Sequence, residues 1–274
     1  MRNLLCLFAF SALAAQAQVL LVDEPKVGSR FEVHDERETT VKILLKARAR
    51  GSGEARRIAS ETRYVEEVVG VGPLKLKRTY ERSLRYDHPV SKPSEPARSS
   101  QHERTVLLEG LNRKLEDGGH LDKEDREELR FERLCAALLP PQRVVESGDQ
   151  WEISGQAINR ALFGDAPAEA SDASGAVVKL RSIKRRKEGE VAVLQVKALR
   201  VRQKKTLGKP EITLELKGGF EWDVVRGAVL EAELEGQVLY IAHAPGDALS
   251  AEAQGPYRWR YQAERVEQEA PSEE

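Results

Sequence analysis

The 274-residue chain contains only two cysteines, which limits how an exported protein can be stabilised. Cys6 lies in an N-terminal segment that we expect to be removed, so Cys135 remains alone and an intramolecular disulfide is excluded. Cys135 lies in the apolar run Leu134–Leu139, which predicts a buried, unreactive thiol; the alternative is a reactive nucleophile. The fold must therefore depend on its core alone.

The chain also lacks an excess of positive or negative charge, because 44 Lys and Arg residues are balanced by 45 Asp and Glu residues. Nucleic-acid binding requires a concentrated basic surface, so this balance predicts no nucleic-acid partner. One basic run, Lys184–Lys187, precedes Glu188-Gly189-Glu190, which predicts an exposed hairpin tip. The alternative for this run is a contact with anionic polymers or lipid headgroups.

Long apolar stretches are absent apart from a short one near the N-terminus. Arg2, the apolar segment Leu4–Ala15 and the A-x-A sequence Ala15–Ala17 form the pattern of a secretory signal peptide. The apolar segment is shorter than the roughly 20 residues of a membrane span. We therefore expect residues 1–17 to be cleaved and the mature chain to be periplasmic or extracellular, without a transmembrane segment. The alternative is a buried N-terminal helix.

Alternation of apolar and charged residues is abundant, and its period of two predicts antiparallel strands. It predicts a β meander over residues 18–111, interrupted by a proline-rich connection at 87–102. A β-rich half follows over 143–266, and an acidic tail occupies 267–274. The predicted fold class is therefore mainly β, with antiparallel meander sheets arranged as a sandwich or a half-open barrel.

The segment 112–142 between these halves has a helical period instead. Asp122 is a favourable N-cap, acidic residues occupy the first turn, and Pro140-Pro141 ends the apolar stripe. We expect one helix, about 123–137, packed against the sheets.

The longest alternation covers Glu211–Tyr240 and predicts a hairpin with even-numbered residues on one face. Keeping that parity requires a three-residue loop, Val225–Gly227, with Gly227 in the left-handed conformation. The predicted partners are Trp222 with Leu230, Phe220 with Ala232, Gly218 with Leu234 and Leu216 with Gly236. This register places Glu221 opposite Glu231. We therefore expect the last strand, Tyr257–Tyr261, to lie alongside and to bring Arg258 or Arg260 near these carboxylates.

The aromatic residues of these strands form the best candidate for a binding surface. They are Phe220, Trp222, Tyr240, Tyr257, Trp259 and Tyr261. If they share one face, they could line an apolar groove for a lipid, an acyl chain or a peptide. The alternative is a core covered by the helix.

Signals for catalysis or metal binding are weak throughout. The five histidines (34, 88, 102, 120 and 243) are scattered, and a calcium loop around Gly118 would need oxygen ligands where Arg113 and Leu115 stand. Glu221 and Asp223 could act as a carboxylate pair, but acids alternate along nearly every strand and indicate a solvated face. We predict no catalytic residue, no metal and no cofactor.

A set of short motifs gives the chain a weak family likeness. The residues concerned are Leu138–Pro141, Val145, Gly148, Asp149, Trp151, Gly218-Gly219-Phe220 and Gly227. In these motifs and in its layout the chain resembles uncharacterised exported bacterial β-rich proteins that carry a domain of unknown function. The resemblance implies an envelope protein without catalytic residues. A looser similarity, carried by no motif, is to half-open β-barrel carriers that shuttle lipoproteins or lipids across the periplasm.

These patterns lead to a hypothesis of a non-enzymatic exported protein that acts as a binding or structural module in the cell envelope. Its partner would be an envelope protein or an apolar ligand. One alternative is a periplasmic carrier of a lipid or lipoprotein acyl chain. The other is a hydrolase that uses carboxylates.

Overall fold

The computed structural model describes most of the chain as a single wide sheet with helices on one side. The described residues are 18–45, 54–71, 74–109, 112–126, 131–140, 143–163, 175–203, 211–243 and 250–266. The expected signal peptide, residues 1–17, and the acidic tail, residues 267–274, lie outside them.

All strands of the main sheet pair in an antiparallel manner, in the order β7-β6-β4-β3-β2-β14-β13-β12-β11-β10-β9, and β5 adds to β4. Their bounds are β2 Arg30–Leu45, β3 Ala55–Val71, β4 Leu74–Pro89, β5 Ala97–Arg98, β6 Thr105–Glu109, β7 Asn112–Leu115, β9 Gln150–Ser154, β10 Gly175–Arg186, β11 Gly189–Gln203, β12 Glu211–Asp223, β13 Ala228–His243 and β14 Ser250–Arg265. The mainly β prediction is confirmed. The arrangement is the half-open one, because a single open sheet replaces the two facing sheets of a sandwich.

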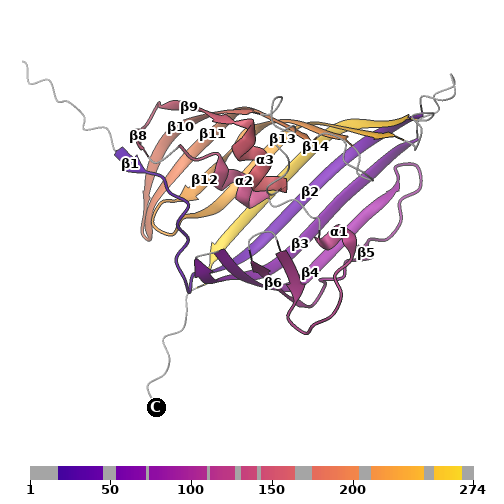
Figure 1. Cartoon of the computed structure of the whole chain (residues 1–274), viewed down its shortest axis with the longest axis horizontal. Helices are drawn as coiled ribbons and strands as arrows, with labels where there is room; N and C mark the ends of the chain where they lie inside the picture. The colour runs from indigo at the N-terminus through magenta and orange to yellow at the C-terminus, as the bar shows by residue number, and fades with distance from the viewer. Residues whose placement is uncertain are drawn as a thin grey trace, which may run out of the picture.

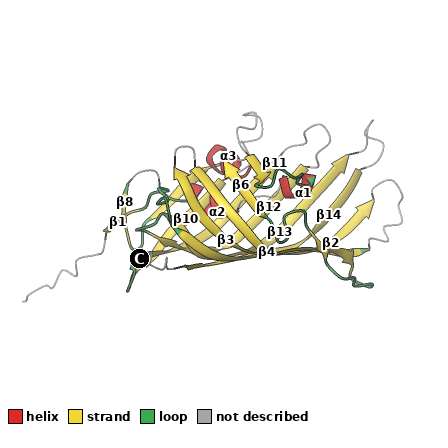
Figure 2. Ribbon diagram, turned by 90° about the horizontal axis from the view of Figure 1, so that it is seen from below, coloured by secondary structure: helices red, strands yellow, loops and turns green. Residues whose placement is uncertain are grey.

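The sheet curves into a trough, and the helices lie on its inner face (Figure 1 and Figure 2). Gly218, Gly236 and Gly255 follow a diagonal across three neighbouring strands. A Cβ atom at any of them would lie within about 2 Å of a carbonyl oxygen on the adjacent strand. Glycine therefore allows the backbones to approach closely along this diagonal, as a strongly bent sheet requires.

Two described helices lie within the segment where the sequence predicted one helix. The expected helix, about 123–137, contains α1 (Lys123–Arg126) and α2 (Phe131–Ala137), and residues 127–130 lie outside the described part. A further helix, α3 (Gly155–Phe163), follows β9 and packs against α2, β9, β10 and β11. No described helix has the length and apolar character that crossing a membrane would need.

Residues 18–29, the first that the structure describes, form a strap beside α2. The short strand β1 (Gln18–Leu20) pairs with β8 (Val144–Glu146) in a separate two-stranded sheet. The chain then runs along one end of the trough before it enters β2 (Figure 1). Arg133 of α2 holds this strap through Asp23, with 2.9 Å between Nη2 and Oδ2.

The register of the β12–β13 hairpin is confirmed over most of its length and wrong at its turn. Phe220 faces Ala232, Gly218 faces Leu234 and Leu216 faces Gly236. Trp222, however, faces Val229, because a bulge shifts the register beside Glu221. The loop has four residues, Val224–Gly227, and the side chain of Asp223 accepts hydrogen bonds from the backbone of this turn. Gly227 is left-handed as predicted, with φ of 63°.

Candidate functional site

The six aromatic residues that the sequence selected lie on the inner face of three adjacent strands, β12, β13 and β14. Trp222 and Trp259 are 1% and 0% exposed, and only Tyr240, toward the far end of β13, is half-buried. The structure therefore brings the predicted set together. It also places five of the six in the core, which is the alternative that the sequence left open.

Helix α2 covers the centre of this aromatic face. The ring of Phe131 packs 5.1 Å from Trp259 and 5.8 Å from Tyr257, measured between centroids. Beneath it, Trp259 donates from Nε1 to Oδ1 of Asp35 at 3.0 Å. The Arg37 guanidinium completes the contact 5.4 Å from the Phe131 ring. Helix and sheet therefore meet through stacked rings with a buried polar contact among them.

A buried ion cluster fastens α2 to the N-terminal side of the sheet. Arg78 of β4 donates from Nε to Glu66 of β3 at 2.6 Å and from Nη2 to Glu132 of α2 at 2.7 Å. The Arg78 and Glu132 side chains are 4% and 9% exposed. Arg78 also lies 4.6 Å above the Tyr64 ring, and burial raises the pKa of the Tyr64 hydroxyl well above its usual value.

A second charged contact fastens α1 to the same strand. Arg85 of β4 pairs with Asp125, which is 1% exposed and also accepts from the backbone and hydroxyl of Ser100. The helices therefore meet β12–β14 through rings and meet β4 through arginine–carboxylate pairs. The sequence-based prediction did not include this second half of the inner face. Its signal was Arg78, which occupies an apolar position in the alternation Leu74, Leu76, Arg78, Tyr80.

A small cavity of about 50 Å3 lies between the strap, α2 and the sheet. Asp23 and Pro25 line it from the strap, and Glu132, Arg133 and Ala136 line it from α2. The lining residues from the sheet and the β12–β13 turn include Phe31, Glu66, Leu76, Trp222, Val229 and Tyr261. This volume is well below the few hundred Å3 that a drug-sized ligand or an acyl chain requires.

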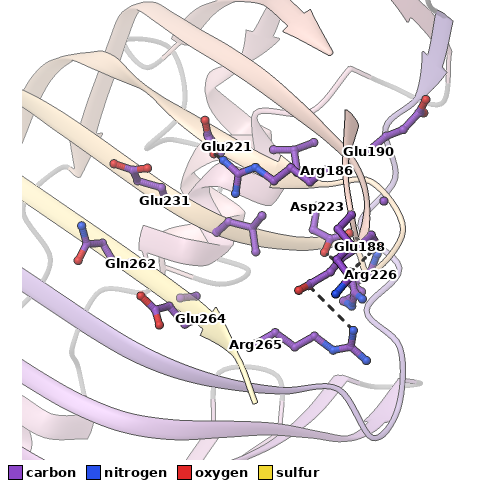
Figure 3. Close-up of a pocket in the computed structure, with 15 residues that line it drawn as sticks. Arg186, Glu188, Glu190, Glu221, Asp223, Arg226, Glu231, Gln262, Glu264 and Arg265 are labelled. Atoms are coloured by element: carbon purple, nitrogen blue, oxygen red, sulfur yellow. Dashed lines mark hydrogen bonds and ion pairs between the residues drawn. The ribbon is translucent and has the colours of Figure 1, made fainter. Parts of the chain in front are cut away.

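A larger cleft, of about 530 Å3, lies at the end of the sheet where the β10–β11 and β12–β13 turns approach the end of β14 (Figure 3). Its lining is charged, and most of these charges are paired within the cleft. Arg226 contacts Asp223 at 2.7 Å, and Arg186 contacts Glu221 at 2.5 Å. Arg265 reaches Glu188 at 4.0 Å (Figure 3).

Glu221 therefore obtains different partners from those predicted. The last strand lies beside β13 as expected, but Arg258 and Arg260 both bond Glu233. Lys184 and Arg186 of the basic run reach Glu221 instead. The prediction of an exposed hairpin tip for Lys184–Lys187 is confirmed, since β10 ends at Arg186 and β11 begins at Gly189.

Groups with shifted pKa values lie in the core and on the outer face. Cys135 is buried as predicted, and desolvation raises the pKa of its thiol well above the usual value. Burial likewise raises the pKa of the Tyr261 hydroxyl. Within the described residues, no three His, Cys, Asp or Glu side chains are grouped so as to hold a metal ion. Asp117 of the supposed calcium loop bonds Arg104 and the backbone of Gly119.

Comparisons with known proteins give no named family. No family model and no curated protein matches the chain, which agrees with the resemblance to uncharacterised proteins. Among solved structures it is similar to lipovitellin, studied for its lipid–protein interactions, with 9% identity and a TM-score of 0.43. That match covers 92% of this chain and 27% of lipovitellin. An outer membrane channel from Pseudomonas putida F1 matches with 8% identity, a TM-score of 0.24 and coverage of 88% and 98%. Scores this low support no functional argument.

Proposed function

We propose that the protein is a non-enzymatic, exported binding module of the cell envelope. The observation that carries this proposal is the filled inner face, where rings and buried ion pairs occupy the space between the helices and the sheet. An enzyme would need convergent polar groups with shifted pKa values in a cleft. The groups with strongly raised pKa values, such as Tyr64 and Cys135, are instead enclosed in the core.

A second candidate is a carrier of an apolar ligand, and the way in which α2 is attached favours it. The seven-residue helix covers the aromatic face of β14 through Phe131 and is fastened by the Arg78–Glu132 pair. A buried ion pair contributes little net stability compared with apolar packing of the same volume. Displacement of α2 would therefore expose an apolar face without loss of the apolar contacts within the sheet.

Native mass spectrometry of the full chain, expressed with residues 1–17 and recovered from the cell envelope, tests both candidates. The binding module predicts a mature mass that begins at Gln18, without bound lipid. Co-purified lipid would favour the carrier. Retention of residues 1–17 in the cytoplasm would contradict export, and turnover of glycosidic or ester substrates would contradict the non-enzymatic proposal.

A variant at the half-buried end of the aromatic face separates the two candidates further. Tyr240→Arg places a charge on the inner face and should abolish lipid binding by a carrier. Gln254→Arg is the matched control, because Gln254 is exposed and follows Ala253, the partner of Tyr240, on the opposite face. Equal lipid binding by both variants would contradict the carrier.

A further inference from the structure

The edge of the main sheet formed by β9, β10 and β11 (Figure 1) is much richer in cations than the chain as a whole. These three strands contain five Lys and Arg residues on β10 and three on β11, but only two carboxylates, Glu152 and Glu190. Six of the cations are exposed or half-buried on the outer side and are called the basic face below. They are Lys179, Arg181, Lys184, Arg186, Lys197 and Arg200.

The strand register shows to which side the basic face points. Lys179 is paired with Gln195 of β11, and Gln195 is paired with Gly219 of β12. Gly219 is paired in turn with Glu233, which lies on the outer face of the sheet. Directly paired residues point to the same face, so Lys179 projects outward as well. From Lys179 to Arg186 the basic face extends over about 23 Å, at about 3.3 Å per residue.

Three cations of the basic face are only partly neutralised by β12. Lys184 and Arg186 share the single carboxylate of Glu221, at 2.8 Å and 2.5 Å. Arg200 pairs with Glu215 at 3.4 Å. Because one carboxylate balances one of the two cations beside Glu221, a net positive charge remains at that end of β10.

The other three cations of the basic face, Lys179, Arg181 and Lys197, form no ion pair with any described residue. Lys197 donates to Oε1 of Gln150 at 2.5 Å, and Lys179 lies between Gln150 and Gln195 on the neighbouring strands. The amide of a glutamine is neutral and leaves the charge of a lysine uncompensated. The basic face is therefore strongly positive, although the whole chain has a net charge of −1.

The form of the basic face favours a broad anionic surface as its partner. Lys179, Arg181 and Lys197 line neither the charged cleft nor the cavity beneath the strap, so they do not enclose a small anion there. Strands β10 and β11 contain no aromatic residue on which a base could stack, which disfavours single-stranded nucleic acid. Cations spread over an open sheet instead match the spread charge of anionic lipid headgroups.

An exposed apolar pair lies beside the basic face. Leu20 of β1 and Val144 of β8 are paired with each other and are 47% and 56% exposed. Arg143 precedes Val144 and donates from Nη2 to the carbonyl oxygen of Gln150 at 3.4 Å. The side chain of the same Gln150 accepts from Lys197. Cations next to exposed apolar side chains are typical of surfaces that lie at the boundary between lipid headgroups and acyl chains.

We propose that the basic face docks on the surface of a bilayer that contains anionic lipids. Its cations would lie against the lipid phosphates, with Leu20 and Val144 at the level of the headgroups. Each Lys or Arg held near an anionic bilayer strengthens binding by about fivefold. The inference deepens the proposed binding function and rests on it, because it names the surface of the cell envelope that the module would bind.

Sedimentation of the intact mature protein with lipid vesicles tests the proposal. The protein should bind vesicles of phosphatidylcholine mixed with phosphatidylglycerol at low salt, and should bind pure phosphatidylcholine at least about tenfold more weakly. High salt should release it from the mixed vesicles, because exposed charges are screened. Equal binding to both kinds of vesicle, or binding that salt does not weaken, would overturn the proposal.

The variant Lys179→Gln/Arg181→Gln/Lys197→Gln removes the three cations that have no ion pair. It should bind the mixed vesicles about a hundredfold more weakly, at about fivefold for each cation. Circular dichroism checks that the fold is retained, and the comparisons of lipid and salt use the unchanged protein and do not depend on this variant.

The matched control is Lys42→Gln/Arg258→Gln/Arg260→Gln, which removes the same charge from the outer face of β2 and β14. It should bind the mixed vesicles within about threefold of the unchanged protein, because these residues lie several strands from the basic face. Equal losses in the two triple variants would show that net charge alone decides binding, and would overturn the proposal.

A labelled single-stranded oligonucleotide is the competing probe. Binding of this probe without binding of the mixed vesicles would assign the basic face to nucleic acid and would also overturn the proposal. None of these results would alter the mass-spectrometric test of the binding module, since contact with a bilayer surface does not withdraw a lipid from it.

Discussion

Successive residues of β12, β13 and β14 point alternately to the inner and the outer face of the sheet. The two faces are stabilised by different interactions. On the inner face Phe220, Trp222 and Trp259 are at most 3% exposed, and Trp259 packs against Phe131 of α2. On the outer face Glu233 pairs with Arg258 and Arg260, all of them exposed. Burial of an aromatic side chain contributes several kcal/mol, whereas an exposed ion pair contributes about 0–1 kcal/mol.

The difference means that the outer face can change its charges at little cost to the fold. Ion pairs link neighbouring strands there, as in Arg260 with Glu36 and Arg200 with Glu215. Charged surfaces of this kind disfavour aggregation of open sheets, and Lys184 and Arg186 disfavour strand addition near the end of β10. Most of the free energy that stabilises the fold therefore comes from the inner face.

The largest expected effect follows from removal of a ring on the inner face. Trp259→Ala should lower the free energy of unfolding by about 4 kcal/mol, because a fully buried indole leaves a cavity beneath α2. Urea denaturation followed by circular dichroism measures the change. Glu264→Ala on the outer face of the same strand is the control and should alter it by less than about 0.5 kcal/mol. Similar losses in both variants would contradict the division between the faces.

A slightly smaller effect is expected at the ion cluster on the inner face. Arg78→Met should cost about 3 kcal/mol, because Glu66 and Glu132 would remain buried without their shared cation. Chemical denaturation again gives the value. The triple variant Arg78→Met/Glu66→Gln/Glu132→Gln removes both uncompensated charges and should recover at least half of the loss. A triple variant less stable than Arg78→Met would show that the cluster is strongly stabilising as a unit.

The inner aromatic face could be predicted from the sequence because alternation fixes which residues share a side. The same parity predicted the partners Phe220–Ala232 and Gly218–Leu234, and the Glu221–Glu231 pair that followed from it led to the predicted position of the last strand. Parity could not predict the turn. Asp223 accepts hydrogen bonds from the backbone of Val225 and Arg226, and this local capping favours a four-residue loop with a bulge.

Pairings across several strands were beyond the sequence pattern. The prediction placed Arg258 or Arg260 of the last strand near Glu221 and Glu231, whereas Lys184 and Arg186 reach Glu221 from β10, which lies two strands away on the opposite side. Long side chains on a curved sheet reach beyond their nearest neighbours, and their reach depends on twist that alternation does not encode. The ion cluster around Arg78 was not predicted for a related reason. One of its carboxylates, Glu132, comes from a helix, and strand alternation does not indicate which helical residue faces the sheet.

The contact between the strap and the β12–β13 turn can be tested at Gly227. An alanine there must adopt a φ of 63° and would place its Cβ about 2.7 Å from the backbone of Glu24. Gly227→Ala should therefore cost about 2 kcal/mol. Gly118→Ala is the matched control. Gly118 has φ of 77°, and no other group lies within 4 Å of the point that an alanine Cβ would occupy. This variant should therefore lose only the backbone cost of about 1 kcal/mol. Equal losses would indicate that the strap does not press on the turn.

The smallest expected effect concerns the outer face at Glu233. Hydrogen bonds from Arg258, followed by the charges of Arg258 and Arg260, hold the pKa of its carboxyl below the usual value. A carboxyl with a lowered pKa in the folded state stabilises the protein above its unfolded-state pKa and loses that contribution as the pH falls through the folded-state value. Glu233→Gln should therefore reduce stability by less than about 1 kcal/mol at pH 7, with the difference from the unchanged protein vanishing toward about pH 3.

Thermal unfolding at pH 7 and about pH 3, each at low and high salt, measures this difference. Salt should reduce it at pH 7, because both partners are exposed to solvent and are screened. Glu231→Gln is the control, since Glu231 lies on the same face of β13 and faces Gln262 of β14 instead of an arginine. A loss at Glu233 as large as that of Trp259→Ala would mean that the outer face shares in holding the trough together, and the contrast between the two faces would fail.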